Sequence, residues 1–212
     1  MTCKRQTPYI WVTWLSKVMA GEQACLWASW FKTHHQSFQK ADQGFDLARW
    51  NLEHTRLLVR LRAELAGRNA VVRVESQNSF KYPHASGAIL AGKPDLVVIE
   101  GGQAIVVDCK TGRRRISDRL QVLIYMYVLP VCFPELALYT ISGRIVYPDG
   151  CVEIATTAVD TSFAEHLDYF IGLIGNQEAP PMAPSSSECR FCDITALDCA
   201  SRVNGPSGNA RH

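Results

Sequence analysis

The chain has 212 residues, 47% of them hydrophobic and 20% charged, and its formal net charge at pH 7 is +2. A chain of this length forms one domain with a real core, and its composition excludes a disordered or fibrous protein. The weak positive charge permits nucleic-acid binding but gives no argument for it. The first apolar run, residues 9–20, is too short for a membrane span and does not resemble a signal peptide. We therefore expect a cytoplasmic protein without membrane contact.

The first part of the chain is predicted to be mainly helical. Apolar and aromatic residues recur at helical spacing over residues 9–39, with a break near Gly21. Residues 45–66 form a second, clearly amphipathic helix. A strand over residues 71–75, a polar loop over residues 78–86 and an entry into the sheet over residues 88–91 are predicted to follow.

The helix over residues 45–66 carries one polar residue, His54, on its apolar face. The other members of that face are Leu47, Trp50, Leu57, Leu58, Leu61 and Leu65. A histidine in such a place is commonly a core residue that is hydrogen-bonded to a carbonyl group. Close to other ligands it binds a metal ion instead, and the helix alone leaves both interpretations open.

Residues 92–111 are predicted to form a β-hairpin around Gly101 and Gly102. With these glycines at the turn, pairing outward along the strands places Asp95 opposite Asp108. Directly opposed side chains have Cβ atoms about 5 Å apart, and two carboxylates at that distance repel each other unless a cation lies between them. Lys110 leaves the same face of the strand as Asp108. This set indicates a divalent-metal hydrolytic centre; the alternative is three polar residues at strand ends.

A basic turn follows the hairpin and leads into a helix. Arg113, Arg114 and Arg115 form a solvated turn, or they hold phosphate groups if the hairpin binds a metal ion. Ser117 is the predicted N-cap of a helix that runs to Pro130.

The remaining elements complete an α/β pattern. Gln121 and Tyr125 lie four residues apart on one face of the helix after the basic turn, as a semi-buried polar pair or as part of a site. Two strands are predicted over residues 136–154, and an amphipathic helix over residues 163–174. Alternation of strands and helices predicts a sheet that is covered by helices.

Eight cysteines in a cytosolic protein call for an explanation other than disulfides, and metal binding is the usual one. Cys189 and Cys192 have CxxC spacing, and Cys199 follows after six residues. Three thiolates need a fourth ligand, for which Cys25 is the better candidate and Cys3 the weaker one. Zinc would take another Cys or His, whereas an iron–sulfur cluster takes a fourth Cys most often. The spacing leaves both metals open.

The motifs together resemble the RecB-type branch of the PD-(D/E)xK nuclease superfamily. They are His54, Asp95 in GKPD, Asp108 and Lys110 in VVDCKTG, and Gln121 and Tyr125 in QVLIY. The upstream cysteine and the C-terminal triplet resemble the iron–sulfur subgroup, which contains CRISPR-associated RecB-family exonucleases and the nuclease domains of AddB-type helicase–nucleases. The resemblance covers residues 10–200 and gains specificity from the DxK strand followed by QxxxY.

The resemblance implies a role for each motif residue. Asp95 and Asp108 would bind Mg²⁺ or Mn²⁺ together with His54 and the backbone carbonyl of Cys109. Lys110 would orient or activate the attacking water and stabilise the pentavalent phosphate. Gln121 and Tyr125 would position the DNA strand. A [4Fe–4S] cluster would be held by Cys25, Cys189, Cys192 and Cys199, with zinc as the lesser alternative.

The expected fold is α/β, with a restriction-endonuclease-like core in which helices flank a mixed central sheet. Residues 1–200 would form a single nuclease domain whose N- and C-terminal segments are joined by the metal cluster, and residues 201–212 a disordered tail. The implied activity is a metal-dependent DNA exonuclease, with endonuclease cutting as a second option, on single-stranded DNA or on overhangs and frayed ends. The resemblance extends to the trimming of spacer precursors in CRISPR adaptation, with integrase proteins or a helicase as partners.

Two hypotheses from other classes compete with the nuclease. One is a non-catalytic DNA-binding or scaffold subunit that keeps the fold and the cluster. The intact set of Asp95, Asp108 and Lys110 argues against it, because a scaffold has no need of these charges. The other is a zinc-stabilised nucleic-acid module. A brown colour of the purified protein, which is typical of an iron–sulfur cluster, would exclude this hypothesis.

Overall fold

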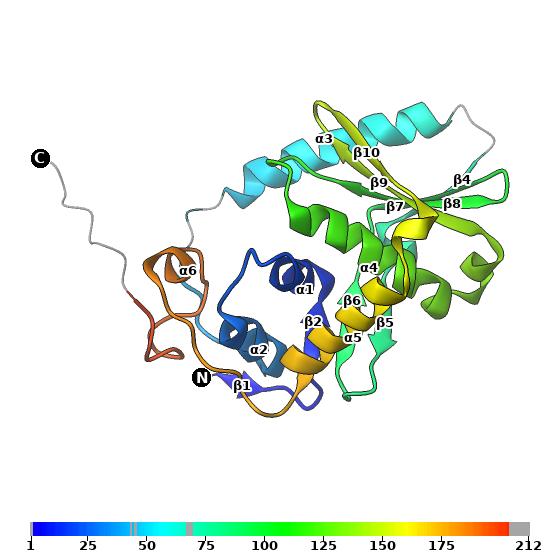
Figure 1. The fold of residues 1–212 in the computed structure, drawn as a ribbon. Helices are drawn as coiled ribbons and strands as arrows, with labels where there is room; N and C mark the ends of the chain where they lie inside the picture. The colour runs from blue at the N-terminus through cyan, green and yellow to red at the C-terminus, as the bar shows by residue number, and fades with distance from the viewer. Residues whose placement is uncertain (1, 43, 45, 67–69, 204–212) are drawn as a thin grey trace, which may run out of the picture.

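The computed structural model describes residues 2–42, 44, 46–66 and 70–203, and its largest sheet has five strands (Figure 1). The strand order is β10-β9-β8-β7-β4; β8 and β9 are parallel, and the other neighbours are antiparallel. The strands are β4 (Val71–Val74), β7 (Leu96–Glu100), β8 (Gln103–Cys109), β9 (Thr140–Tyr147) and β10 (Gly150–Ile154). The expected mixed central sheet is therefore confirmed.

The hairpin of β7 and β8 has the predicted register. Leu96 lies opposite Val107, and Glu100 lies opposite Gln103. Gly101 and Gly102 have φ angles of 57° and 78°, in the left-handed region that residues with a side chain seldom adopt. The two glycines thus permit the two-residue turn that fixes the pairing along both strands.

Helices cover both faces of this sheet, α3 (Leu47–Ala66) on one face and α4 (Ile116–Cys132) on the other. The core beneath α3 contains Leu57, Leu61, Leu65, Leu96, Val98, Val107 and Cys109. Val97 and Val106 belong instead to the larger core that α4 shares with α5 (Thr161–Gly175). Because side chains alternate along a strand, the positions of Asp95 and Asp108 belong to the α4 face.

The N-terminal region differs from its prediction. Residues 9–39 are not all helical: Tyr9–Trp11 is strand β2, followed by α1 (Val12–Met19) and α2 (Leu26–His34). β2 pairs in parallel with β6 (Ile89–Gly92). The strand depends on this partner, which lies far along the chain, so the local spacing of apolar residues could not reveal it.

The predicted polar loop over residues 78–86 is also wrong in part. Residues 80–83 form β5 (Phe80–Pro83), which pairs with β6 and completes a three-stranded sheet of order β2-β6-β5. Phe80 is buried, and Tyr82 packs against the same core. The two aromatic residues alternate with polar residues, as in a strand with one buried face. The polar neighbours led to the prediction of a loop instead.

The start of α4 is capped differently from the prediction. Arg115 is the N-cap, so Ser117 lies within the helix, which continues past Pro130 to Cys132. The carboxylate of Glu22 accepts hydrogen bonds from the Ser117 backbone N–H (3.0 Å) and from its hydroxyl group (2.7 Å). A residue 95 positions earlier thus satisfies a free N–H group at the start of α4.

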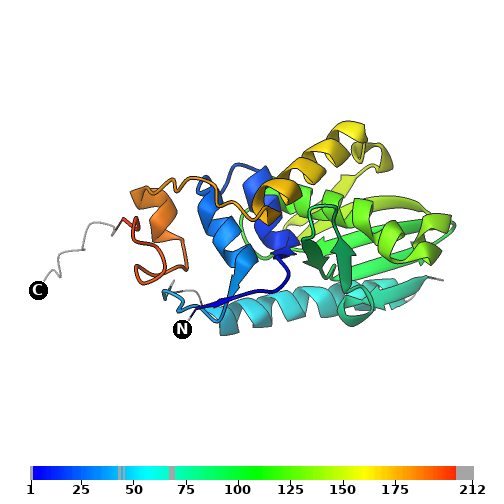
Figure 2. The same ribbon diagram turned by 90° about the horizontal axis from the view of Figure 1, so that it is seen from below.

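The C-terminal segment packs against α2, as Figures 1 and 2 show. Glu188, in α6 (Ser186–Arg190), accepts hydrogen bonds from the backbone N–H groups of Ala24 and Cys25. The Lys32 ammonium lies 3.4 Å from the Asp193 carboxylate. In the predicted tail, residues 204–212 lie outside the described part of the chain.

Smaller elements complete the fold. They are β1 (Cys3–Lys4), β3 (His35–Gln36), η1 (Glu75–Gln77), η2 (Pro134–Leu138) and η3 (Thr156–Ala158). The predicted strands over residues 136–154 and the helix over residues 163–174 are confirmed by β9, β10 and α5. None of the helices in the described part of the chain has the length and apolarity that a membrane span requires.

Candidate metal centre and active site

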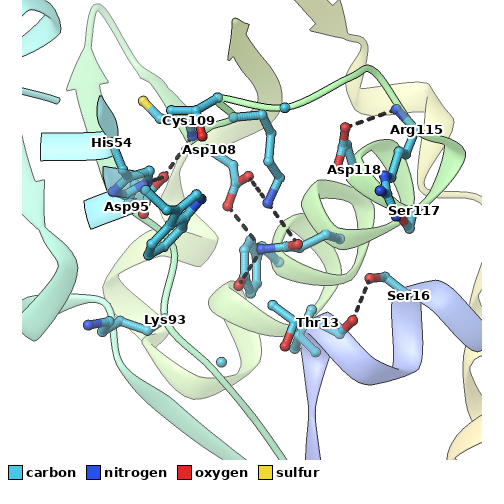
Figure 3. Close-up of a pocket in the computed structure, with 18 of the residues that line it drawn as sticks. Thr13, Ser16, His54, Lys93, Asp95, Asp108, Cys109, Arg115, Ser117 and Asp118 are labelled. Carbon is cyan, nitrogen blue, oxygen red and sulfur yellow. Dashed lines mark hydrogen bonds and ion pairs between the residues drawn. The ribbon is translucent and has the colours of Figure 1, made fainter. Parts of the chain in front are cut away.

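A cavity of about 680 Å³ lies where β7 begins and β8 ends (Figure 3). Residues of α1, α3, η1, the β6–β7 connection and the start of α4 line it. It brings together the predicted residues His54, Asp95, Asp108, Lys110, Gln121 and Tyr125. Side chains from a helix, a hairpin and a second helix therefore meet at one place.

His54 contacts a carboxylate, not a core carbonyl group. Its Nε2 atom lies 3.2 Å from Asp95 Oδ2, and the Cys109 backbone N–H donates to the same oxygen over 2.7 Å. The hydrogen bond to Asp95 raises the pKa of the His54 imidazole, and this outweighs the opposite effect of burial. The structure thus places His54 where a metal ligand would lie, beside the first acid of the hairpin.

Glu75 is a member of this group that the sequence did not reveal. The ligand atoms of His54, Glu75 and Asp95 lie within 4.8 Å of one another. The register of β4 explains the position: Val74 pairs with Leu96, so one further step brings Glu75 next to Asp95. The sequence placed Glu75 at the end of a predicted strand, but it contained no signal for the partner of that strand.

The second acid belongs to a hydrogen-bonded network. Lys110 Nζ lies 2.7 Å from Asp108 Oδ2 and donates to Gln121 Oε1 over 3.0 Å. Gln121 Nε2 lies 3.0 Å from both Asp108 Oδ1 and the Tyr125 hydroxyl group. Gln121 and Tyr125 are largely buried but line the cavity, and their hydrogen bonds hold Asp108 and Lys110 in place.

The family follows from a comparison of the whole chain with known protein families. A model of the PD-(D/E)XK nuclease superfamily matches residues 16–197. The chain belongs to the PD-(D/E)XK nuclease superfamily. No curated protein matches the chain.

A solved structure supports the fold of this PD-(D/E)XK nuclease. The structure titled "Crystal structure of SSO0001" has a TM-score of 0.50 and 19% sequence identity with the chain. The match covers 94% of this chain and 89% of that chain. At this identity the similarity concerns the arrangement of helices and strands alone.

Nucleases of this superfamily use divalent metal ions such as Mg²⁺ or Mn²⁺, and the residues present fit such an ion. Carboxylate oxygens are the ligands that these ions prefer, and an imidazole is compatible with Mn²⁺. Asp108 Oδ2 lies 2.7 Å from the Lys110 ammonium group. A carboxylate has about four lone-pair positions, so Asp108 can contact Lys110 and a metal ion together.

The charges at the cavity floor also favour a cation. Burial raises the pKa of Asp108 to about 6, Lys110 opposes this effect, and the Asp95 charge adds to it. Burial alone would lower the pKa of the Lys110 amine, but the neighbouring Asp108 carboxylate raises it, so the ammonium form is retained. The site thus combines a fixed positive charge with buried carboxylates, whose repulsion a divalent ion would relieve.

The predicted basic turn is divided between two roles. Arg113 and Arg115 line the cavity. Arg114 is directed elsewhere: its guanidinium group lies over the Tyr147 ring, 4.9 Å from the centroid, and 3.1 Å from Asp149. Two of the three arginines thus lie near the carboxylates, and the Arg115 guanidinium group is 4.0 Å from the Glu22 carboxylate.

The four predicted cluster ligands lie in one region, between α2 and the C-terminal segment. Cys25 is the N-cap of α2, and Cys189 is buried in α6. Cys25, Cys192 and Cys199 pack against a small core of Trp27, Ala28, Phe31 and Ile194. Burial raises the pKa of the Cys199 thiol, and the charges of Cys189 and Cys25 raise it further. Residues from both ends of the chain therefore lie around one small core, although among the described residues no three of these sulfur atoms lie within 4.8 Å of one another.

Proposed function

We propose that the chain is a metal-dependent deoxyribonuclease that hydrolyses phosphodiester bonds in the cavity beside β7 and β8. One observation carries the proposal: Asp95, Asp108 and Lys110 converge with His54 at the floor of a cavity, in a chain of the PD-(D/E)XK nuclease superfamily. A scaffold subunit would not require buried like charges at this place, since they destabilise a protein that holds no cation.

In this proposal Asp95, Asp108 and His54 hold Mg²⁺ or Mn²⁺, together with the backbone carbonyl of Cys109. Glu75 joins them because its carboxylate lies beside Asp95 and His54. A divalent ion supplies a nucleophilic water at neutral pH and neutralises charge on the phosphate oxygens. These side chains would hold the ion, and therefore the phosphate group to be cut, at the floor of the cavity.

Lys110 provides a second positive charge, whose position the protein determines. Its ammonium group is held by Asp108 and by Gln121, and burial keeps it from moving into solvent. A charge that is fixed before the reaction stabilises the negative charge that develops in the transition state. We propose that Gln121 and Tyr125 position Asp108 and Lys110, and through them the DNA strand.

The preferred substrate is single-stranded DNA or a frayed end, cut from an end or internally. Support for exonuclease action comes from the RecB-type motifs, as does the link to CRISPR spacer precursors, to integrase proteins or to a helicase. These finer assignments rest on the resemblance of motifs and stay predictions.

We also propose that Cys25, Cys189, Cys192 and Cys199 hold a [4Fe–4S] cluster, with zinc as the alternative. The support is their common position between α2 and the C-terminal segment. The cluster would join these segments and needs no redox role in the hydrolysis. The visible absorbance and the iron and zinc content of anaerobically purified protein distinguish the two metals.

The decisive test is cleavage of end-labelled single-stranded DNA by anaerobically purified protein with Mg²⁺, with Mn²⁺ and with EDTA. We expect metal-dependent products that Asp108→Ala and Lys110→Ala both abolish. Glu165→Ala and Lys81→Ala, which change exposed residues of the same charges, should retain activity. The position of the label gives the polarity of cutting. Metal-loaded wild-type protein that binds DNA but cuts none would overturn the nuclease in favour of the scaffold subunit.

A further inference from the structure

A second hollow lies at the start of the chain, outside the cavity that holds the carboxylates. This N-terminal groove has a volume of about 350 Å³, and its lining consists of Cys3, Lys4, Arg5, Gln6, Thr7, Tyr9 and Gln36. Two of these lining residues are cations and none is an acid. The lining of the cavity, in contrast, contains the acids Glu75, Asp95, Asp108 and Asp118. The groove therefore suits an anion, whereas the carboxylates of the cavity suit a metal ion.

The cations of the groove are not occupied by ion pairs. Neither Lys4 nor Arg5 lies within 4.0 Å of a carboxylate in the part of the chain that the structure describes. Arg5 Nη1 donates instead to Gln36 Oε1 over 3.2 Å, and this neutral partner leaves the guanidinium charge intact. In contrast, three cations of the cavity lining have carboxylate partners, namely Lys93, Lys110 and Arg115. A phosphate group can therefore bind Lys4 and Arg5 without breaking an ion pair.

The backbone holds these two cations in a defined place. β1 pairs with β3, so that Lys4 lies opposite His35. The backbone N–H of Arg5 then donates to the carbonyl of His34 over 2.7 Å. Because the segment is hydrogen-bonded to the end of α2, the backbone that carries these charges does not have to be ordered when an anion binds.

Strand β2 connects the groove to the cavity, since it leads from the N-terminal segment to α1 (Figure 1). Side chains alternate along a strand, so Tyr9 and Trp11 leave one face of β2 while Ile10 is buried on the other. The rings of Tyr9 and Trp11 meet edge-on, with centroids 5.5 Å apart. Tyr9 lines the groove and Trp11 lines the cavity. The two hollows therefore adjoin at this pair of rings, and a polymer that leaves the cavity past Trp11 enters the groove.

We propose that the N-terminal groove binds the phosphate backbone of the DNA strand next to the segment in the cavity, with Lys4 and Arg5 as the phosphate contacts. This inference rests on the proposed function and extends its site to the first residues of the chain. A strand of a few nucleotides would occupy the cavity alone, whereas a longer strand would also reach the groove. Affinity for DNA should therefore rise with strand length until both hollows are filled.

Cys3 reports directly on the groove, because it lines the groove and is exposed. Wild-type protein is treated with iodoacetamide, an uncharged reagent, in EDTA and low salt. The reaction is run without DNA, with a single strand of roughly 16 nucleotides and with one of roughly 4 nucleotides, each at about ten times its Kd. Mass spectrometry gives the alkylation rate of Cys3 and, as an internal control, of Cys151, which is exposed on β10. The longer strand should slow the alkylation of Cys3 about tenfold and leave that of Cys151 unchanged. The shorter strand should leave both unchanged.

Charge variants test the phosphate contacts. Lys4→Gln/Arg5→Gln keeps hydrogen-bonding groups but removes both charges, so it should abolish the protection of Cys3. The log–log salt slope for the longer strand should fall by roughly 0.7 for each phosphate group that is no longer neutralised. Lys4→Arg/Arg5→Lys, which keeps both charges, should retain the protection. Lys81→Gln/Arg144→Gln removes the same two charges outside both linings and should also retain the protection and the slope.

A longer strand that binds but leaves Cys3 as reactive as in the free protein would overturn the inference. A folded Lys4→Gln/Arg5→Gln protein with wild-type protection and salt slope would overturn it too, as would wild-type protein that binds neither strand. Protection by the shorter strand would show that the groove binds DNA without the cavity, which contradicts the proposed path. None of these measurements depends on cutting. A protein in which DNA protects Cys3 but is never cut retains this inference and loses the proposed function, and one that cuts DNA without protecting Cys3 loses the inference alone.

Discussion

At the level of single residues, Glu75 lies beside the proposed metal ligands but also pairs with a lysine. Lys93 Nζ lies 2.7 Å from Glu75 Oε2, and both side chains are substantially exposed. An exposed pair of this kind contributes about 0–1 kcal/mol. A divalent ion beside Asp95 and His54 would therefore displace Lys93 from Glu75 at little cost.

We predict that Glu75→Gln raises the Mn²⁺ concentration for half-maximal cleavage about tenfold, because one anionic ligand is removed while the hairpin acids remain. The measurement is a metal titration of the cleavage rate. Glu53→Gln, on an exposed part of α3 where its partner is Arg49, should leave the titration unchanged. Equal titrations for Glu75→Gln and wild type would remove Glu75 from the metal centre.

Asp95 could be predicted from the sequence and Glu75 could not, because their neighbours in the site lie at different distances along the chain. Asp95, Asp108 and Lys110 belong to one hairpin, and the turn glycines determine their register. Glu75 reaches Asp95 only because β4 pairs with β7, which follows it at a distance in the chain, and His54 does so through the packing of α3. The local sequence pattern predicts neighbours within one hairpin, whereas neighbours from distant parts of the chain depend on tertiary packing.

At the level of elements, the packing of α4 on the sheet depends on the absence of a side chain. A Cβ atom at Gly143 of β9 would lie 2.5 Å from Val122 Cγ1 and 2.8 Å from Met126 Sδ. Both contacts are closer than a carbon atom tolerates, so the Val122 and Met126 side chains would have to shift or α4 would have to move away from the sheet. α4 carries Gln121 and Tyr125, so its height above the sheet also sets the network beneath Asp108.

We predict that Gly143→Ala lowers the free energy of unfolding by about 1–3 kcal/mol through overpacking. Urea denaturation of the variant measures it. Gly172→Ala is the matched control: it lies within α5, has no atom within 4 Å of the added Cβ, and replaces glycine by a better helix former. It should stabilise the protein by up to about 1 kcal/mol. Destabilisation of equal size in both variants would refute the close approach at Gly143.

The cap of α4 gives a prediction that depends on pH. Glu22→Ala removes the acceptor of both Ser117 hydrogen bonds and should cost about 1 kcal/mol at pH 7. Although burial acts to raise the pKa of Glu22, the bonds from Ser117 lower it below its ordinary value. A carboxyl group whose pKa is lower in the folded protein stabilises the fold at pH values above its unfolded-state pKa, which is about 4.3 for Glu. This stabilisation is lost as the pH falls through the folded-state pKa.

Urea denaturation at several pH values checks the sign. The difference in stability between wild type and Glu22→Ala should be constant above about pH 5 and should shrink as the acid is protonated at lower pH. Glu178→Ala, an exposed acid after α5, should show no such trend. A difference that grows on acidification would contradict the hydrogen-bonded carboxylate.

Helices and strands could be predicted from the sequence where their residue pattern is clear and their pairing partner lies nearby in the chain. The amphipathic helix α3, the β7–β8 hairpin, the strands β9 and β10 and the helix α5 follow their sequence patterns. β2 and β5 were missed because each depends on pairing with β6. The cap of α4 was misassigned because a hydroxyl group near the helix start is a common cap, whereas here a distant glutamate supplies the acceptor.

At the level of the whole molecule, the two ends of the chain form one subassembly beside the nuclease core. The backbone N–H of Ala41 donates to the carbonyl of Asp193, and Lys40 forms a β-bridge with Ile194. Ile194 is fully buried against Trp27 and Phe31. The core of this subassembly is small, so the thiols of Cys25, Cys189, Cys192 and Cys199 are where a metal cluster would add most to its stability.

Cys25→Ser tests that arrangement, because Cys25 is the only proposed ligand from the N-terminal part of the chain. Its loss would open a cross-link that closes most of the chain. A covalent link of that span contributes about 4–5 kcal/mol, which corresponds to roughly 10–20 °C in the melting temperature of a domain of this size. We predict a loss of that order, with loss of bound metal and of visible absorbance, in protein purified without oxygen. Cys151→Ser, which changes an exposed cysteine of β10, should retain both properties. If Cys25→Ser keeps its full metal content and melting temperature, the fourth ligand lies elsewhere, and the two ends of the chain are held together by packing alone.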